Sequence, residues 1–325
     1  MLHRAARRRR KRGEIILDGW KSSLKGVLIG ALTGIALGLI GFAMAEIPRT
    51  HAMGGVMFLL VPFAAGFAIA MVTRGRWQVS AAAILATLGA LAVLIAMRLE
   101  TPLCALLALP LLFTGLLAGI VIGIGYRRLT GRSRGNHVTL ASFAFLAMPL
   151  LIFAGHRAEV SALIHPRQEV VTSTIRLAAS PDQVWADLRL FDSLGGRKPF
   201  LMYIGLPIPV RCVTQGSGEG SKRTCYFDRG YIEETVIEWS PPNRMQLLID
   251  RTKMPGRHWL GFETAEYDLQ PDGDGTTLTR VTTIISNLYP AWYWRPFERW
   301  GVASEHEYIF RDLVRRTPPP VSQNH

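Results

Sequence analysis

The sequence predicts an α-helical membrane domain of five transmembrane helices, followed by an α+β domain in which a curved antiparallel sheet grips a long C-terminal helix. Three observations carry this prediction. The first half of the chain contains five apolar runs of membrane-spanning length. The second half changes to short runs of alternating polarity that are typical of strands. The chain has 37 Lys and Arg against 24 Asp and Glu, and the whole excess lies in its first half.

The position of the basic residues in the chain indicates whether they favour a nucleic-acid-binding domain or a membrane orientation. Residues 1–25 hold nine basic and two acidic side chains, residues 26–155 hold eight and two, and residues 156–325 hold twenty of each. A nucleic-acid-binding domain would carry its positive charge on the folded domain, so we expect no nucleic-acid partner. A content of 49% hydrophobic residues and three cysteines also excludes a disordered chain and a small disulfide-rich domain.

The five apolar runs contain no Asp, Glu, Lys, Arg or His, and each approaches the roughly 20 residues that a helix needs to cross a bilayer. They cover residues 26–45, 52–72, 79–97, 103–125 and 138–155. The sequence thus predicts a basic tail over 1–25, a membrane domain over 26–155 and a linker over 156–167. The fifth run is the shortest, and without it the second half of the chain would lie in the cytoplasm.

The connections between these runs predict an orientation. One set of helix ends carries the basic tail and six arginines, whereas the opposite set carries Arg49 and Arg98. The six are Arg74, Arg76, Arg127, Arg128, Arg132 and Arg134. By the positive-inside rule the N-terminus is cytoplasmic, and the C-terminal domain lies outside the plasma or inner membrane. An alternative is that the first run is a cleaved signal peptide, because Ala43-Met44-Ala45 fits a peptidase site.

Glycines four residues apart mark one face of two of the runs. The first run has Gly26, Gly30, Gly34 and Gly38, and the fourth has Gly115, Gly119 and Gly123. Such faces let helix backbones approach closely in lipid. We expect the first and fourth helices to pack on each other, with homodimerisation through the first as the alternative. The runs lack ionisable groups, which argues against ion-coupled transport and favours a packed anchor over a pathway for an uncharged lipid.

The second half reads as a single domain over 168–316, followed by a Pro-rich tail over 317–325. A strand over 169–177 precedes Ser180-Pro181-Asp182, an N-cap with proline at the first helical position. Six further strands are expected, and a helix over 297–315 follows them. The strands cover about 208–215, 221–227, 231–239, 244–251, 261–270 and 275–287.

Two segments of this domain resemble a known family. The run from Val171 to Leu188 is similar to the first strand and helix of the START-like superfamily, also called SRPBCC, which includes polyketide cyclase/dehydrase-like and lipid-transport proteins. Gly218 to Phe227 and Ile237 to Met245 resemble its glycine hairpin and Pro-Pro-Asn-Arg turn. The resemblance implies a helix-grip fold around an apolar cavity for a hydrophobic ligand, but a fold alone does not establish an activity.

Two common motifs, one metal-binding and one phosphate-binding, are missing from the sequence. It has no H-E-x-x-H and no phosphate-binding loop, and its eight histidines lack ligand spacing. The glycine-rich run 216–220 lies between two strands and predicts a hairpin turn. We therefore expect no metal and no cofactor, and leave open whether the domain is an enzyme.

The hairpin turn leads to a prediction about two cysteines. If Gly218 and Glu219 form a two-residue turn, Cys212 faces Cys225 at a non-hydrogen-bonded pair, where the Cα atoms are about 4.5 Å apart. That spacing permits a disulfide, which an outward-facing domain can form, against the alternative of two reduced cysteines.

Candidate ligand contacts follow from alternation on the strands and from the apolar stripe of the last helix. His306 lies within that stripe and either orients a ligand head group or is a core histidine satisfied locally. The full set of candidates is Met245, Leu247, Ile249, Tyr267, His306, Ile309 and Phe310. The aromatic residues Trp292, Tyr293 and Trp294 are candidates for the membrane interface, against simple packing on the sheet.

Together these features predict a membrane-anchored protein whose extracytoplasmic domain binds a hydrophobic small molecule such as a lipid. Its partners are then the lipid bilayer and that ligand. Two alternatives stay open: a cyclase- or dehydrase-type enzyme, which needs an acid–base pair in the cavity, and a structural or regulatory protein that binds a partner protein.

Overall fold

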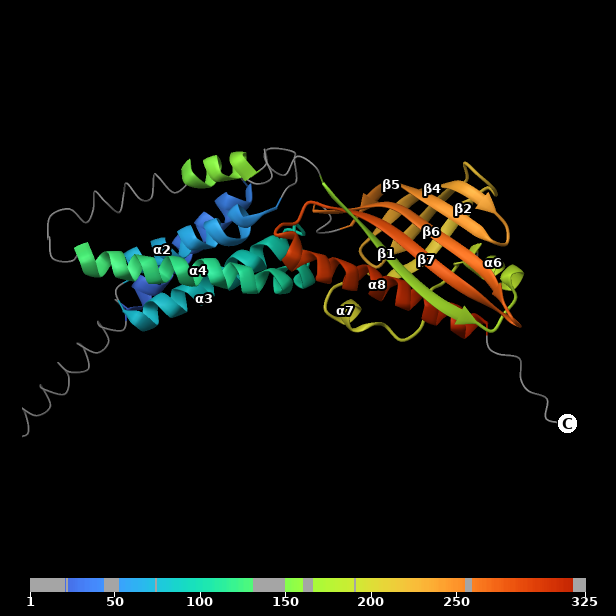
Figure 1. Cartoon of the computed structure of the whole chain (residues 1–325). Coiled ribbons are helices and arrows are strands. Elements are labelled where there is room, and N and C mark those ends of the chain that lie inside the picture. Colours follow the sequence, from blue (N-terminus) through green and yellow to red (C-terminus); the bar gives the residue numbers. More distant parts are fainter. Residues whose placement is uncertain are drawn as a thin grey trace, which may run out of the picture. The chain divides into compact units, whose positions relative to one another are not determined.

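The computed structural model describes residue 21 and residues 23–43, 53–73, 75–130, 150–159, 166–189, 191–254 and 259–317. These residues form two compact units. The first unit lies within Met1–Met97 and Ala108–Ile164, and the second lies within Arg98–Leu107 and His165–His325. Figure 1 shows the first unit as a group of helices and the second as a sheet with helices.

Apolar helices make up the first unit. Three helices among the described residues are long and apolar enough to cross a membrane. The elements are the helix Ser23–Ala43, the π-helix η1 (Val56–Leu60), α2 (Val61–Val72), α3 (Arg76–Ala96) and α4 (Pro102–Thr130), of which the residues up to Leu107 belong to the second unit. The three candidate spans are Ser23–Ala43, Arg76–Ala96 and Pro102–Leu129.

These three helices correspond to the first, third and fourth expected spans. The second appears as a shorter apolar helix, Val56–Val72, in which η1 continues directly into α2. Of the fifth, residues 150–155 are helical, and 138–149 lie outside the described residues. Most of the basic tail and half of the linker also lie outside them, as do Arg49, Arg74, Arg132 and Arg134. The described residues thus hold three of the five expected long apolar helices.

The glycine faces are covered by helices of the same chain, and this corrects the expected packing of the first helix on the fourth. A Cβ atom added at Gly30 would lie 2.7 Å from Thr73 Cγ2, and one at Gly34 would lie 2.6 Å from Ala86 Cβ. The first helix therefore packs on α2 and α3. A Cβ atom at Gly119 of α4 would meet the carbonyl oxygen of Phe63 in α2. The Gly26, Gly30, Gly34 and Gly38 face is thus occupied within the chain rather than left for a homodimer.

The second unit is built on one antiparallel sheet of seven strands in the order β1-β7-β6-β5-β4-β3-β2. Each strand alternates polar and apolar residues, because one face of the sheet is covered and the other is not. The strands are β1 (Arg167–Leu177), β2 (Pro209–Gln215), β3 (Lys222–Phe227), β4 (Gly230–Ser240), β5 (Arg244–Lys253), β6 (Leu260–Asp272) and β7 (Gly275–Ser286). All seven expected strands are present.

The sheet curves around the C-terminal helix α8 (Ala291–Arg316) (Figure 1). Two short helices, α6 (Pro181–Arg189) and α7 (Phe200–Tyr203), connect β1 to β2. The main core joins Trp185 and Leu188 of α6 with Ile309 and Leu313 of α8 and with the inward side chains of the strands. This is the helix-grip arrangement that the sequence predicts.

The last helix is longer at its start than expected. It begins at Ala291, six residues before the expected start at 297, and it runs through Pro296. Its first turns are held by tertiary contacts: Trp294 is buried, and the Tyr293 hydroxyl donates to the carbonyl oxygen of Leu107. A proline inside a helix removes one backbone donor, so the sequence alone favoured a start after Pro296.

Close packing of α4 on α2 gives a test of the helical unit. In Gly119→Ala the new methyl group meets the Phe63 carbonyl oxygen, so the two helices must separate. We expect a loss of about 1–3 kcal/mol of stability, measured as a lower midpoint of thermal unfolding of the detergent-purified full chain. The matched control is Gly125→Ala on the same helix, where a Cβ atom meets nothing within 4 Å. An equal loss in both variants would contradict this packing.

Candidate functional site

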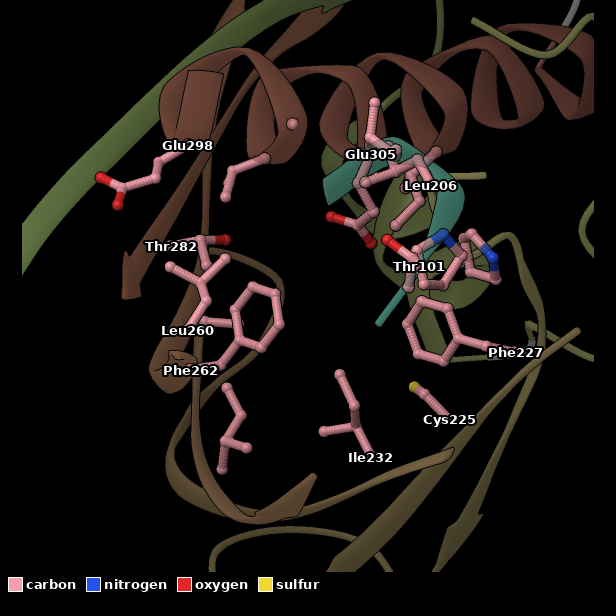
Figure 2. Close-up of a pocket in the computed structure, with 18 of the residues that line it drawn as sticks. Thr101, Leu206, Cys225, Phe227, Ile232, Leu260, Phe262, Thr282, Glu298 and Glu305 are labelled. Carbon is pink, nitrogen blue, oxygen red and sulfur yellow. The ribbon is translucent and has the colours of Figure 1, made fainter. Parts of the chain in front are cut away.

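An apolar cavity lies in the second unit, between the curved sheet and α8. Its volume is about 150 Å³. Figure 2 shows Phe227, Ile232 and Phe262 on its walls and Glu305 reaching into it from α8. Its apolar lining comprises Leu103, Leu107, Phe191, Leu194, Leu206, Phe227, Ile232, Ile249, Ala265, Leu260, Phe262, Leu288, Trp294, Phe297, Val302 and Ile309. Such a cavity suits an apolar molecule.

The segment Arg98–Leu107 belongs to the same unit and completes one part of the wall. Trp259 donates its Nε1–H to Glu100 Oε1 at 2.6 Å, and the Tyr293 hydroxyl donates to the carbonyl oxygen of Leu107 at 2.6 Å. Thr101 and Cys104 line the cavity beside them. These polar contacts hold a short stretch of chain against the otherwise apolar site.

Two ion pairs face the cavity, which is unusual in an apolar setting. The first joins Arg223 on β3 to Glu234 on β4, with 3.5 Å between Nε and Oε2. Both side chains are buried. Burial raises the pKa of the Glu234 carboxyl, and the nearby guanidinium groups of Arg223 and Arg280 oppose that rise. Desolvation outweighs the attraction, so the neutral form of Glu234 is favoured relative to a carboxyl in water.

The second pair joins Arg280 on β7 to Glu305 on α8, with 2.9 Å between Nη2 and Oε2. Arg280 is 7% exposed, and its guanidinium lies over the ring of Tyr267, 5.2 Å from the ring centroid. Burial opposes the charged form, but Glu305 keeps the pKa of Arg280 above its usual value. The cavity therefore holds a permanently charged guanidinium on its sheet side.

A disulfide lies beside the first pair. Cys212 on β2 faces Cys225 on β3 in the register that the turn predicts, and their sulfur atoms are bonded. Three glycines of the turn, Gly216, Gly218 and Gly220, have positive φ angles of 90°, 90° and 81°. Arg223 donates from Nη2 to Cys212 Sγ at 3.4 Å. Both cysteines line the cavity, so the bond joins two neighbouring strands of its wall.

The predicted ligand contacts divide into two groups. Ile249, Tyr267 and Ile309 line the cavity. Met245 and Leu247 are almost fully buried in the main core, and Phe310 lies at a separate shallow groove between β1 and α8. The division runs along β5: Met245 and Leu247 lie in the main core, whereas Ile249, farther along the same strand, lines the cavity.

His306 is a core histidine that is satisfied locally. Its ring is 0% exposed and does not line the cavity. Its Nε2 lies 2.8 Å from the hydroxyl of Thr282, and its Nδ1 lies 2.9 Å from the hydroxyl of Ser173. Burial, with a smaller contribution from Arg280, lowers the pKa of His306 to about 2. The neutral ring thus connects α8 to β1 and β7.

The three aromatic candidates for the membrane interface have different surroundings. Trp292 is 75% exposed, whereas Trp294 is 4% exposed and lines the cavity. Tyr293 lies between them, with ring centroids 5.8 Å from Trp292 and 5.2 Å from Trp294. Trp292 is therefore the one of the three whose side chain is open to solvent or lipid.

The sequence analysis did not predict the five charged residues that line the cavity, Arg223, Glu234, Arg280, Glu298 and Glu305. The pattern that could have revealed those on the strands is a charged residue at a position where the alternation of the strand places an inward, apolar side chain. Glu234 lies between Ile232 and Val236 on β4, and Arg280 lies between Leu278 and Thr282 on β7. Alternation alone does not identify them, since the outward face of β7 is also partly apolar.

Among the described residues, no three His, Cys, Asp or Glu side chains come together as a metal site. The cavity has an apolar wall, two guanidinium groups and three carboxyl groups. These groups can orient a ligand or exchange protons with it.

The neutral state of His306 gives a pH prediction. Between pH 6.5 and about 2 the unfolded chain binds a proton at His306 that the folded chain does not. Stability therefore falls as pH decreases below 6.5, by about 1.4 kcal/mol per pH unit from this group. We expect the thermal midpoint of His306→Gln to decrease less than that of the wild type between pH 7 and pH 5. Equal decreases in the two proteins would contradict a neutral, buried His306.

The solved structures that are similar to this chain each match a little under half of it. A START superfamily protein from Mycobacterium smegmatis is 13% identical, covers 46% of this chain and 96% of its own, and has a TM-score of 0.35. A protein from Chromobacterium violaceum is 15% identical, with 46% and 97% covered and a TM-score of 0.34. Norcoclaurine synthase from Thalictrum flavum, in complex with dopamine and hydroxybenzaldehyde, is 14% identical, with 48% and 92% covered and a TM-score of 0.31.

No curated protein matches this chain. The family described as polyketide cyclase/dehydrase and lipid transport matches residues 168–317. That range spans all the strands after the first residue of β1, and it includes α8. The C-terminal half of the chain is a polyketide cyclase/SRPBCC (START-like) domain.

Proposed function

We propose that this protein is a membrane-anchored binding protein whose START-like domain holds a hydrophobic ligand in the cavity between its sheet and α8. The observation that carries the proposal is the apolar wall of that cavity, which comes from β3, β4, β6 and α8 together. Each Å² of apolar ligand surface removed from water contributes about 25 cal/mol. The buried charged groups then orient the ligand rather than supply most of the affinity.

The long apolar helices of the first unit supply the anchor. Three of them meet the length and composition of a membrane span. The arginines near their ends favour a cytoplasmic N-terminus and an extracytoplasmic START-like domain. The disulfide between Cys212 and Cys225 supports that orientation, because such bonds persist in oxidising compartments.

A second candidate function is a cyclase- or dehydrase-type reaction. It is favoured by two of the three carboxyl groups of the cavity, Glu234 and Glu305. Burial raises the pKa of Glu234, whereas Glu305 is held by Arg280. A carboxyl group whose pKa is raised is suited to act as a general acid.

Ligand binding is tested by native mass spectrometry of the full chain released from detergent, with extraction of whatever it carries. We expect a co-purifying hydrophobic molecule in the wild type and its loss in Gly301→Leu. Gly301 lines the cavity, and a Cβ atom there meets only Leu206 Cδ1, at 3.8 Å, so a larger side chain fills the space without disturbing the backbone. Occupancy should decrease at least about tenfold.

The matched control for that experiment is Arg299→Leu, which places the same side chain at an exposed position of α8. It should retain the ligand. An empty wild-type protein that also fails to bind an added fluorescent fatty acid would contradict the proposal and favour a partner-binding role. If an added hydrophobic substrate were recovered as a product lighter by the mass of one water, the enzyme would be favoured instead.

The proposed orientation is tested with two fusions to the C-terminus of the full chain. Alkaline phosphatase folds only in an oxidising compartment, so we expect an active phosphatase fusion and a dark green-fluorescent-protein fusion. Non-reducing peptide mapping of the same membranes should recover Cys212 linked to Cys225. A fluorescent fusion with an inactive phosphatase would place the domain in the cytoplasm and overturn the orientation.

A further inference from the structure

Arg280 brings a guanidinium with unsatisfied N–H groups to the wall of the cavity. Its Nη2 donates to Glu305 Oε1 at 3.1 Å. Its Nε and Nη1 atoms are buried, and neither has a hydrogen-bond partner within the part of the chain that the structure describes. The whole residue is 7% exposed. Donors on two sides of one buried cation therefore lack a partner, and Arg280 lines the cavity, from which a ligand would bring acceptor oxygens to them.

An arginine in this position stays charged, because its side chain is not deprotonated in proteins. The ring of Tyr267, 5.2 Å from the guanidinium carbon, gives a favourable cation–π contact but offers no acceptor to the N–H groups. Unsatisfied donors of a buried cation are strongly unfavourable. Acceptor oxygens from a ligand would remove that penalty.

The charge balance of the cavity also favours a negative ligand group. Its two guanidinium groups are each paired with one carboxyl group, Arg223 with Glu234 and Arg280 with Glu305. The third carboxyl group of the cavity, Glu298, is paired with Arg167 instead. Burial raises the pKa of Glu234, so that carboxyl contributes less negative charge than a carboxylate in water would. His306, adjacent to Glu305 in the sequence, is held neutral by its own burial. The positive groups are thus incompletely compensated.

We propose, building on the function proposed above, that the ligand is a single apolar chain ending in an anionic oxygen group, in its simplest form a carboxylate, whose oxygens accept hydrogen bonds from Nε and Nη1 of Arg280. The apolar chain lies against Ile232, Leu260 and Phe262, which face the same space (Figure 2). Charge-assisted hydrogen bonds are the stronger kind, so the head group determines which apolar molecules are retained.

The test compares two photoreactive probes on the full chain in detergent: a decanoic acid that carries a diazirine in its chain, and the corresponding decanol. After irradiation, mass spectrometry measures the labelling of peptides that contain Ile232, Leu260 or Phe262. We expect the acid to label these peptides about tenfold more than the alcohol at neutral pH.

The informative variant is Arg280→Met together with Glu305→Met. Removing both partners of a buried ion pair leaves no uncompensated charge, so the fold is retained more readily than in a single variant. The ratio of acid to alcohol labelling should decrease to about one, while alcohol labelling shows that the cavity is intact. The control is Arg176→Gln, an exposed arginine of β1 that pairs with Asp272 and Asp274 and does not line the cavity.

The outcomes separate this inference from the function on which it rests. If neither probe labels the cavity peptides of the wild type, ligand binding itself fails. If both label them equally, ligand binding stands and the anionic head group is wrong. An acid preference that persists in the double variant also overturns the role of Arg280. A preference that disappears there and remains in Arg176→Gln supports it.

Discussion

The rest of the START-like domain depends on the position of α8 along β1 and β7. That position is fixed by buried polar side chains that are spaced about two turns apart on α8. Glu298 accepts hydrogen bonds from Arg167 and Ser286, and His306 lies between Ser173 and Thr282. Buried polar groups must keep their partners, so rotation or sliding of the helix would leave several of them unsatisfied. The helix face that remains toward the sheet interior then forms one side of the cavity.

This division of roles explains why charged residues occur inside an apolar domain. Stability comes from the close-packed cluster around Leu247, Leu278 and Leu313, which excludes water. The pairs Arg223–Glu234 and Arg280–Glu305 lie where that packing gives way to the cavity. Because desolvation offsets much of the attraction in a buried ion pair, such pairs are poor stabilisers and fit better with a role toward a ligand.

Within single elements, the sequence was a good guide. Alternating polarity located all seven strands, and the glycine turn set the register that brings Cys212 opposite Cys225. The start of α8 was less predictable, since Trp294 and Tyr293 stabilise its first turns through contacts with residues distant from the helix. The glycine faces were recognisable as packing surfaces, but their partners were not, because α2 brings small residues of its own, such as Gly66, against α4.

By itself, then, the sequence determined the two-part organisation, the apolar helices and the helix-grip order of strands, because length, polarity and turn chemistry are local properties. Only the tertiary structure decided which inward side chains meet the cavity. Ile249 and Tyr267 do, whereas Met245 and Leu247 are covered by the core. The same holds for His306 and Arg280: both are inward and polar, yet one is fully satisfied by hydroxyl groups and the other keeps unsatisfied donors. That difference depends on the curvature of the sheet and the placement of α8, which bring together residues more than a hundred positions apart.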